Sequence, residues 1–177
     1  MVEKPLGKVY IDGANMFFTQ KKLEWFFDWK KIKDFIKEKY NVADFRYYTG
    51  VKENNDKMKR YLKYLDKIGF IVITKPIKII KISEEEKLKA SSKFNKIHKS
   101  NCDVEMTTDI LLDRANIDEI ILFSGDSDFQ YLVKKLKDVG KKVFVYSSRK
   151  TISWELKLEA SIYFYLEDIK NKIIRKK

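Results

Sequence analysis

Short apolar runs alternate with amphipathic stretches along this chain, and the alternation predicts a parallel sheet. The strands that we expect span residues 8–12, 44–49, 70–74, 119–124, 142–147 and 162–166. Helix-like segments separate most of these strands, an order that is typical of a parallel sheet with helices on both faces. The length of 177 residues fits one domain over 1–177. We therefore expect a single-domain α/β fold.

Capping residues and apolar periodicity predict where the helices lie. The expected helices span 28–40, 54–68, a segment from about 103, 128–139 and, as a short last crossover, 152–160. Asp28 is a typical N-cap, and Gly69 and Gly140 are typical helix ends. The helix from Asp103 is predicted to bury Val104, Leu111, Leu112 and Ala115. The helix over 128–139 is predicted to bury Leu132, Val133 and Leu136.

The segment from Lys75 to Asn101 differs from the rest, because it is rich in lysine and has weak periodicity. A long segment of this kind inside a compact domain is usually functional or disordered. It leads directly into Asp103, so it could border a binding site, but a solvated surface insertion fits equally well. Its histidine, His98, is better explained as a surface residue than as a general base.

Charge adds a functional clue, because 38 Lys and Arg residues stand against 26 Asp and Glu, a formal charge of +12. A lysine-biased composition explains part of this excess, and a polyanionic partner such as nucleic acid explains it more sharply. A single cysteine, Cys102, excludes an internal disulfide and suggests a reducing, cytoplasmic location; a small buried thiol is its expected role. No apolar run is long enough to predict a membrane span.

Carboxylates follow two of the predicted buried strands directly. Asp12 comes after Val9-Tyr10-Ile11, and Ser124-Gly125-Asp126-Ser127-Asp128 comes after Ile120–Phe123. Such positions at the carboxyl ends of strands are where an open α/β sheet binds ligands. A third acidic group, Asp103, Glu105 and Asp109, opens a predicted helix. Together these oxygens could hold Mg²⁺ or Mn²⁺.

Each of these motifs also has a structural explanation. Asp12-Gly13 could form an ordinary turn with Asn15 as a helix cap. In the functional explanation, Asp12 binds metal directly, and Asn15 either hydrogen-bonds a phosphate or orients Asp12. Asp126 and Asp128 could cap a helix, although capping requires only one of them. Asp103 and Thr107 share a helix face, whereas Asp109 lies on another face and is the weaker candidate.

An aromatic run, Trp25-Phe26-Phe27-Asp28-Trp29, precedes the helix that begins at Asp28. Stacking on nucleobases and a dimer contact are two functional explanations. Packing beneath the helix is the better supported one. The sequence leaves the oligomeric state open, and a homodimer is one option.

Taken together, the motifs resemble the NYN domains of the LabA-like group, in the PIN-like nuclease superfamily. The resemblance rests on 9–15, 101–105 with Asp109, and 123–129 in this order, and extends to Gly140–Val143 and Ile152-Ser153. It implies a three-layer α/β/α sandwich and divalent-metal-dependent cleavage of RNA. The catalytic and metal-binding positions that it implies are Asp12, Asp103, Asp126 and Asp128, with Asn15 and Ser124 as polar helpers and Asp109 at a recurrent acidic position. Thr107, on the same helix face as Asp103, is a further candidate for a supporting polar residue.

We therefore expect a ribonuclease that uses Mg²⁺ or Mn²⁺, is endonucleolytic and prefers single-stranded RNA. A metal-activated water would be the nucleophile, so the chemistry needs no catalytic Ser, Cys or His. The lysines expected to bind the RNA backbone are Lys21, Lys22, Lys93, Lys96 and Lys99. The alternatives are a catalytically weak RNA-binding regulatory module of the same fold and a phosphohydrolase that acts on small nucleotides.

Overall fold

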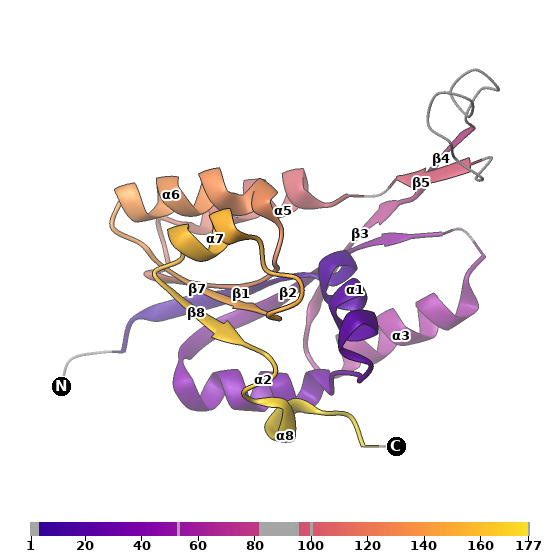
Figure 1. Ribbon diagram of the computed structural model, residues 1–177, viewed down its shortest axis with the longest axis horizontal. Coiled ribbons are helices and arrows are strands. Elements are labelled where there is room, and N and C mark those ends of the chain that lie inside the picture. Colours follow the sequence, from indigo (N-terminus) through magenta and orange to yellow (C-terminus); the bar gives the residue numbers. More distant parts are fainter. Residues whose placement is uncertain (1–3, 53, 82–95, 100, 177) are drawn as a thin grey trace.

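The computed structural model describes residues 4–52, 54–81, 96–99 and 101–176, with no side chains described between 78 and 100. A central sheet of six parallel strands, in the order β3-β2-β1-β6-β7-β8, forms its middle layer (Figure 1). The strands are β1 Leu6–Asp12, β2 Asn41–Val51, β3 Ile71–Pro76, β6 Glu119–Phe123, β7 Lys142–Ser147 and β8 Ile162–Tyr165. The six predicted strands and the α/β class are therefore confirmed.

Helices cover both faces of the sheet and make three layers (Figure 1). One face packs against α1 Gly13–Leu23, α2 Trp29–Lys39, α3 Asp56–Lys67 and α8 Lys170–Ile173. The other face packs against α5 Asp103–Asp113, α6 Gln130–Asp138, which follows the short helix η1 Ser127–Phe129, and α7 Trp154–Glu159. Each face has its own apolar core, so the central strands β1, β6 and β7 are buried on both sides, as their continuous apolar runs predict.

Several local predictions are confirmed. Asp28 caps α2, since its carboxylate accepts a hydrogen bond from the Lys31 backbone N–H at 3.2 Å. The three residues predicted to face inward from α6, Leu132, Val133 and Leu136, are buried. The aromatic run packs as its structural explanation requires, because Trp25, Phe27 and Trp29 are buried and only Phe26 is exposed.

The prediction for the buried face of α5 is only partly right, because Leu111 packs against the core but Val104, Leu112 and Ala115 are exposed. Val104 and Leu112 are each 72% exposed, and the helix instead buries Met106 and Ile110. Met106 and Ile110 lie four residues apart and therefore share a face of the helix, and Asp113, one turn further along, forms ion pairs with Lys8 and Arg46 of the sheet.

Helices α1 and α8 and one pair of strands were not predicted. Helix α1 begins at Gly13, where the sequence suggested only a turn or a cap. Strands β4 Lys78–Lys81 and β5 Lys96–Lys99 pair antiparallel and extend away from the three layers beyond the end of β3 (Figure 1). In the described part of the chain, none of the helices has the length and apolar character that crossing a membrane requires.

The strand order has a switch point between β1 and β6. From β1 the chain continues outward to β2 and β3, and from β6 it continues outward in the other direction to β7 and β8. Connections therefore leave the carboxyl ends of β1 and β6 on opposite faces, which opens a crevice between them. Asp12 ends β1 and Ser124 follows β6, so the fold places both predicted motifs at this crevice.

Candidate functional site

A pocket of about 190 Å³ lies at the switch point. It is lined by Asp12, Ala14, Asn15, Phe18, Tyr48, Thr49, Gly50, Asn101, Cys102, Asp103 and Asp126. These residues come from the carboxyl ends of strands and from the starts of α1 and α5. The fold thus gathers into one pocket four of the residues for which the sequence predicted function.

Three carboxylates form the centre of the site. Asp103, Asp126 and Asp128 each offer an oxygen, and these oxygens lie within 4.8 Å of one another. One Asp103 oxygen, Oδ2, is buried without a hydrogen-bond partner among the described residues. A buried carboxylate oxygen without a partner is unfavourable unless a ligand satisfies it. Oxygen donors of this kind suit a hard divalent cation, so the three residues fit Mg²⁺ or Mn²⁺.

The loop after β6 holds two of these carboxylates in place. The Asp126 N–H donates to Ser124 Oγ at 3.2 Å, and the Asp128 N–H donates to Asp126 Oδ1 at 3.0 Å. Asp126 is the N-cap of η1, so this aspartate also has the structural role that the sequence left open.

Gly125 and Asn15 join this loop to its neighbours. A Cβ on Gly125 would collide with the Thr151 carbonyl oxygen, so only glycine fits there. The Asn15 side-chain oxygen accepts a hydrogen bond from the Gly125 N–H at 3.0 Å. Asn15 therefore ties the start of α1 to the acidic loop, and its side-chain oxygen contacts protein.

Asp12 lies at the back of the pocket and is almost fully buried. Its two oxygens accept hydrogen bonds from the Asn15 N–H at 3.0 Å and from Ser124 Oγ at 3.1 Å. Burial, reinforced by the negative charges of Asp103 and Asp126, raises its pKa to about 6. Asp12 is thus the N-cap of α1 and also lines the acidic pocket.

Burial also raises the pKa of Asp103, and the charges of Asp126 and Asp128 add to the shift. Across the described residues, no lysine or arginine forms an ion pair with any of the four aspartates. Their mutual repulsion is therefore not neutralised by this part of the protein. A bound cation would relieve it.

The other acidic residues of α5 lie elsewhere. Asp109 accepts a hydrogen bond from the Tyr48 hydroxyl at 2.7 Å and lies 3.5 Å from an Arg46 nitrogen. Glu105 pairs with Lys75 at 2.7 Å. Asp109 does not line the pocket itself, and its link to the pocket is this hydrogen bond from Tyr48, which does line it. Thr107 is half-buried, and within the described ranges no hydrogen bond joins it to the three carboxylates.

Cys102 is buried as expected, and burial raises the pKa of its thiol to about 11, which keeps it protonated.

The structure describes the side chains of only two of the five lysines predicted to bind RNA. Lys21 and Lys22 are exposed in the last turn of α1, the helix whose first turn borders the pocket. Lys93 lies outside the described residues. Lys96 and Lys99 lie in β5, but their side chains also lie outside the description.

Sequence reasoning missed two parts of the pocket. Tyr48 and Thr49 lie at the carboxyl end of β2, next to Asp12 on β1, so the rule that identified Asp12 could also have found them. Phe18 lines the pocket from α1. Its role depends on a helix that the sequence did not predict.

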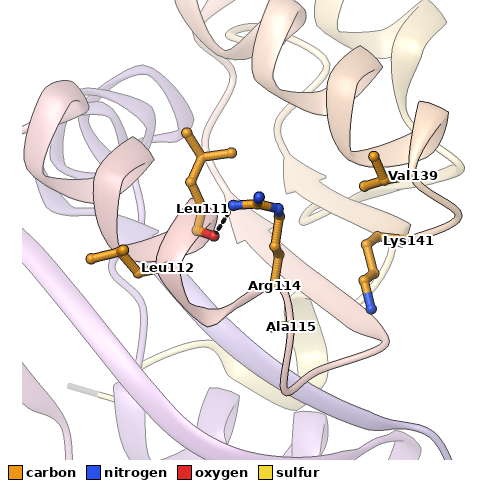
Figure 2. Close-up of a pocket in the computed structure, with 6 residues that line it drawn as sticks. All are labelled: Leu111, Leu112, Arg114, Ala115, Val139 and Lys141. Atoms are coloured by element: carbon orange, nitrogen blue, oxygen red, sulfur yellow. Dashed lines mark hydrogen bonds between the residues drawn. The ribbon is translucent and has the colours of Figure 1, made fainter.

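A larger hollow of about 330 Å³ lies between the C-terminal ends of α5 and α6 (Figure 2). Its lining consists of Leu111, Leu112, Arg114, Ala115, Val139 and Lys141. These side chains include no carboxylate, and Arg114 turns back to donate to the Leu111 carbonyl oxygen. The hollow is wide and shallow, so its volume alone does not indicate chemistry, and we place the functional site at the smaller acidic pocket.

A doubly wound parallel sheet with an acidic pocket at its switch point defines the structural class of this protein. A family model, the NYN domain, matches residues 8–167, and the chain belongs to that family, whose members are generally ribonuclease-like. It is 30% identical over 167 residues to the low amplitude and bright protein LabA of Synechococcus elongatus, covering 93% of this chain and 86% of that one. The resemblance to the LabA-like group is therefore confirmed.

A solved structure shares the fold. A crystal structure of a protein of unknown function from Vibrio parahaemolyticus superimposes with a TM-score of 0.77 and covers 99% of each chain. The two sequences are 22% identical, so this likeness bears on the fold alone.

Proposed function

We propose that this protein is a divalent-metal-dependent ribonuclease that cleaves RNA endonucleolytically within a single NYN domain. The observation that carries the proposal is the group of Asp103, Asp126 and Asp128, whose oxygens converge within 4.8 Å with no basic partner among the described residues. A protein that only binds polyanions gains nothing from unneutralised carboxylates beside its ligand. Membership of a ribonuclease-like family supports the same reaction class.

Asp103, Asp126 and Asp128 would hold Mg²⁺ or Mn²⁺. When bound, such an ion neutralises charge on the phosphate and lowers the pKa of water enough to generate a nucleophile. Asp12 adds a fourth negative charge behind this group, and Ser124 and the Asn15 backbone keep its two oxygens oriented. The hydrogen bond from Gly125 to Asn15 joins α1 to the acidic loop and so helps to position the pocket before substrate enters.

Basic side chains would supply the affinity for RNA. Lys21 and Lys22 lie on the helix that borders the pocket, and the whole chain carries a formal charge of +12. Contacts between lysine and phosphate depend on salt and carry no sequence information, so we expect binding to be largely independent of RNA sequence.

The test compares linear and circular RNA as substrates. Labelled single-stranded RNA, its circular form, single-stranded DNA and free nucleotides are incubated with the purified protein in Mn²⁺ or in EDTA. We expect the circular RNA to be linearised in Mn²⁺ and to stay intact in EDTA. Hydrolysis of nucleotides alone would instead indicate a phosphohydrolase, and binding of RNA without cleavage would indicate a regulatory module.

A further inference from the structure

The acidic pocket has an aromatic side chain at its edge. Phe18, on α1, lines the pocket together with Asp12, Asp103 and Asp126, yet 62% of its surface is exposed. The other carbon-rich part of the lining, around Tyr48 and Cys102, is buried. Of the lining residues that the structure describes, Phe18 alone presents a large apolar ring to solvent.

Helical spacing extends this edge into a stripe. Ala14, Phe17, Phe18 and Lys21 lie on consecutive turns of α1, and all four side chains are exposed. The rings of Phe17 and Phe18 meet edge to face with their centroids 6.2 Å apart. The ammonium of Lys21 lies 4.5 Å from the centroid of the Phe17 ring. The stripe thus runs from the acidic pocket over two aromatic rings to positive charge.

The order of acidic pocket, aromatic rings and lysines along α1 suits a single nucleotide strand, in which phosphates and bases alternate. A phosphodiester would face the acidic pocket and its cation, a flat base could cover an exposed ring, and the next phosphates would meet Lys21 and Lys22. Aromatic rings bind unpaired bases by stacking, whereas bases inside a duplex already stack on one another and do not offer their faces. An exposed phenylalanine does not stabilise the fold as a buried one does, so its position beside the acids is informative.

We propose that Phe18 is the stacking platform for an unpaired base of the RNA strand whose phosphodiester lies at the acidic pocket. Phe17 and Lys21 continue the same binding surface along α1. This inference rests on the proposed function and deepens it, because it restricts the substrate to single-stranded RNA. It also makes Phe18 the residue that contacts a base, whichever base it is, while the aspartates and lysines respond only to phosphate.

The experiment separates stacking on bases from attraction to phosphate. Binding of a fluorescein-labelled octauridylate is compared with binding of an abasic ribose-phosphate oligomer of the same length and charge, by fluorescence anisotropy. The titrations are done in EDTA so that the oligomers stay intact. Affinity can therefore be measured whether or not the protein cleaves RNA.

We expect the parent to bind the base-bearing oligomer about fivefold to a hundredfold more tightly, which is the affinity equivalent of one stacked base. Phe18→Leu should remove this preference and leave binding of the abasic oligomer unchanged, and Phe18→Trp should keep the preference. Phe26→Leu is the matched control, because Phe26 is 58% exposed and does not line the pocket. Circular dichroism of each variant checks that it is folded.

Two results would overturn the inference. The first is an equal preference for the base-bearing oligomer in the parent and in Phe18→Leu. The second is a change of molecular mass in light scattering on Phe18→Leu with no change of RNA affinity, which would assign the stripe to contact between copies of the chain. If the parent does not cleave RNA but still prefers the base-bearing oligomer, and Phe18→Leu loses that preference, the proposed catalysis is wrong and the stacking role of Phe18 holds.

Discussion

The two ends of helix α5 carry the same side chain in opposite surroundings. At the N-terminal end, burial and then the charges of Asp126 and Asp128 raise the pKa of Asp103. At the C-terminal end, burial of Asp113 also opposes ionisation, but hydrogen bonds from Lys8 and Tyr10 and the charge of Arg46 outweigh it and lower the pKa. One aspartate is surrounded by like charge and the other by opposite charge.

The difference separates a ligand site from a structural one. Asp113 lies 2.9 Å from both Lys8 Nζ and an Arg46 nitrogen, so its charge already has partners within the protein. These ion pairs hold α5 to β1 and β2 and thereby set the position of its first residue, Asp103. Asp103 has an unpaired buried oxygen and no basic partner among the described residues. An acidic cluster is therefore informative about ligands only after its internal partners have been counted.

The largest expected difference between the two ends is in catalysis. Asp103→Asn and Asp126→Asn should each lower RNA cleavage by about a thousandfold or more, roughly 4 kcal/mol in the barrier, because each removes a charged oxygen that would hold the cation. Affinity for RNA, carried by basic and aromatic groups, should remain. Initial rates on circular RNA in Mn²⁺ measure the loss, with Asp138→Asn on the exposed surface of α6 as the control. Parental rates in either variant would remove Asp103 or Asp126 from the site.

The second largest effect is on the stability that the ion pairs at the C-terminal end of α5 contribute. Arg46→Met should lower the free energy of unfolding by about 3 kcal/mol, because it removes one of the two basic partners that the partly buried carboxylates of Asp44 and Asp113 share. Urea denaturation of parent and variant measures the change. Arg60→Met, at an exposed position of α3, is the control and should have little effect. Equal midpoints for the two variants would mean that the ion pairs do not hold α5.

A smaller effect concerns metal binding. Millimolar Mn²⁺ should raise the melting temperature of the parent, by the equivalent of about 2.7 kcal/mol if its concentration is a hundred times the dissociation constant. Asp103→Asn should lose most of this rise, whereas Asp113→Asn should keep it. Differential scanning calorimetry with EDTA as the reference makes the comparison. The same rise in all three proteins would place the ion elsewhere.

The smallest effect, on the order of 1 kcal/mol, is a dependence on pH of opposite sign at the two ends. A carboxyl group whose pKa is lowered by folding stabilises the fold at a pH above its pKa in the unfolded chain, and this stabilisation is lost as the pH falls. Asp113→Asn should therefore be less stable than the parent at pH 7 and should approach the stability of the parent in acid. A raised pKa favours the fold at low pH and loses that advantage as pH rises. Asp103→Asn in EDTA should therefore be more stable than the parent at pH 7, with no difference below 3.8, the ordinary pKa of aspartate.

Thermal unfolding of the parent and of both variants from pH 3 to pH 7 tests the two signs together. Curves that stay parallel over this range would show that neither aspartate has a shifted pKa.

Local sequence pattern is sufficient to predict the layers of this protein and the edge at which its chemistry lies. Continuous apolar runs such as 120–123 identify strands that are buried on both faces, and their alternation with helices makes the sheet parallel. Because the carboxyl ends of parallel strands share one edge, Asp12 and the 124–128 loop can be assigned to a common crevice from the sequence alone. These inferences depend only on local pattern and on chain connectivity.

Which acids belong together depends on contacts between distant parts of the chain. Asp103, Glu105, Asp109 and Asp113 all lie on one helix, and nothing in their spacing shows that Lys75, Arg46 and Lys8 neutralise three of them. The buried face of α5 also depends on the tertiary structure, since Val104 and Leu112 share helical spacing but face solvent, while Met106 and Ile110 meet the core. Periodicity records what one element would bury in isolation. The partners that reach it from distant strands set its charge, its orientation and the residues that remain free to bind a ligand.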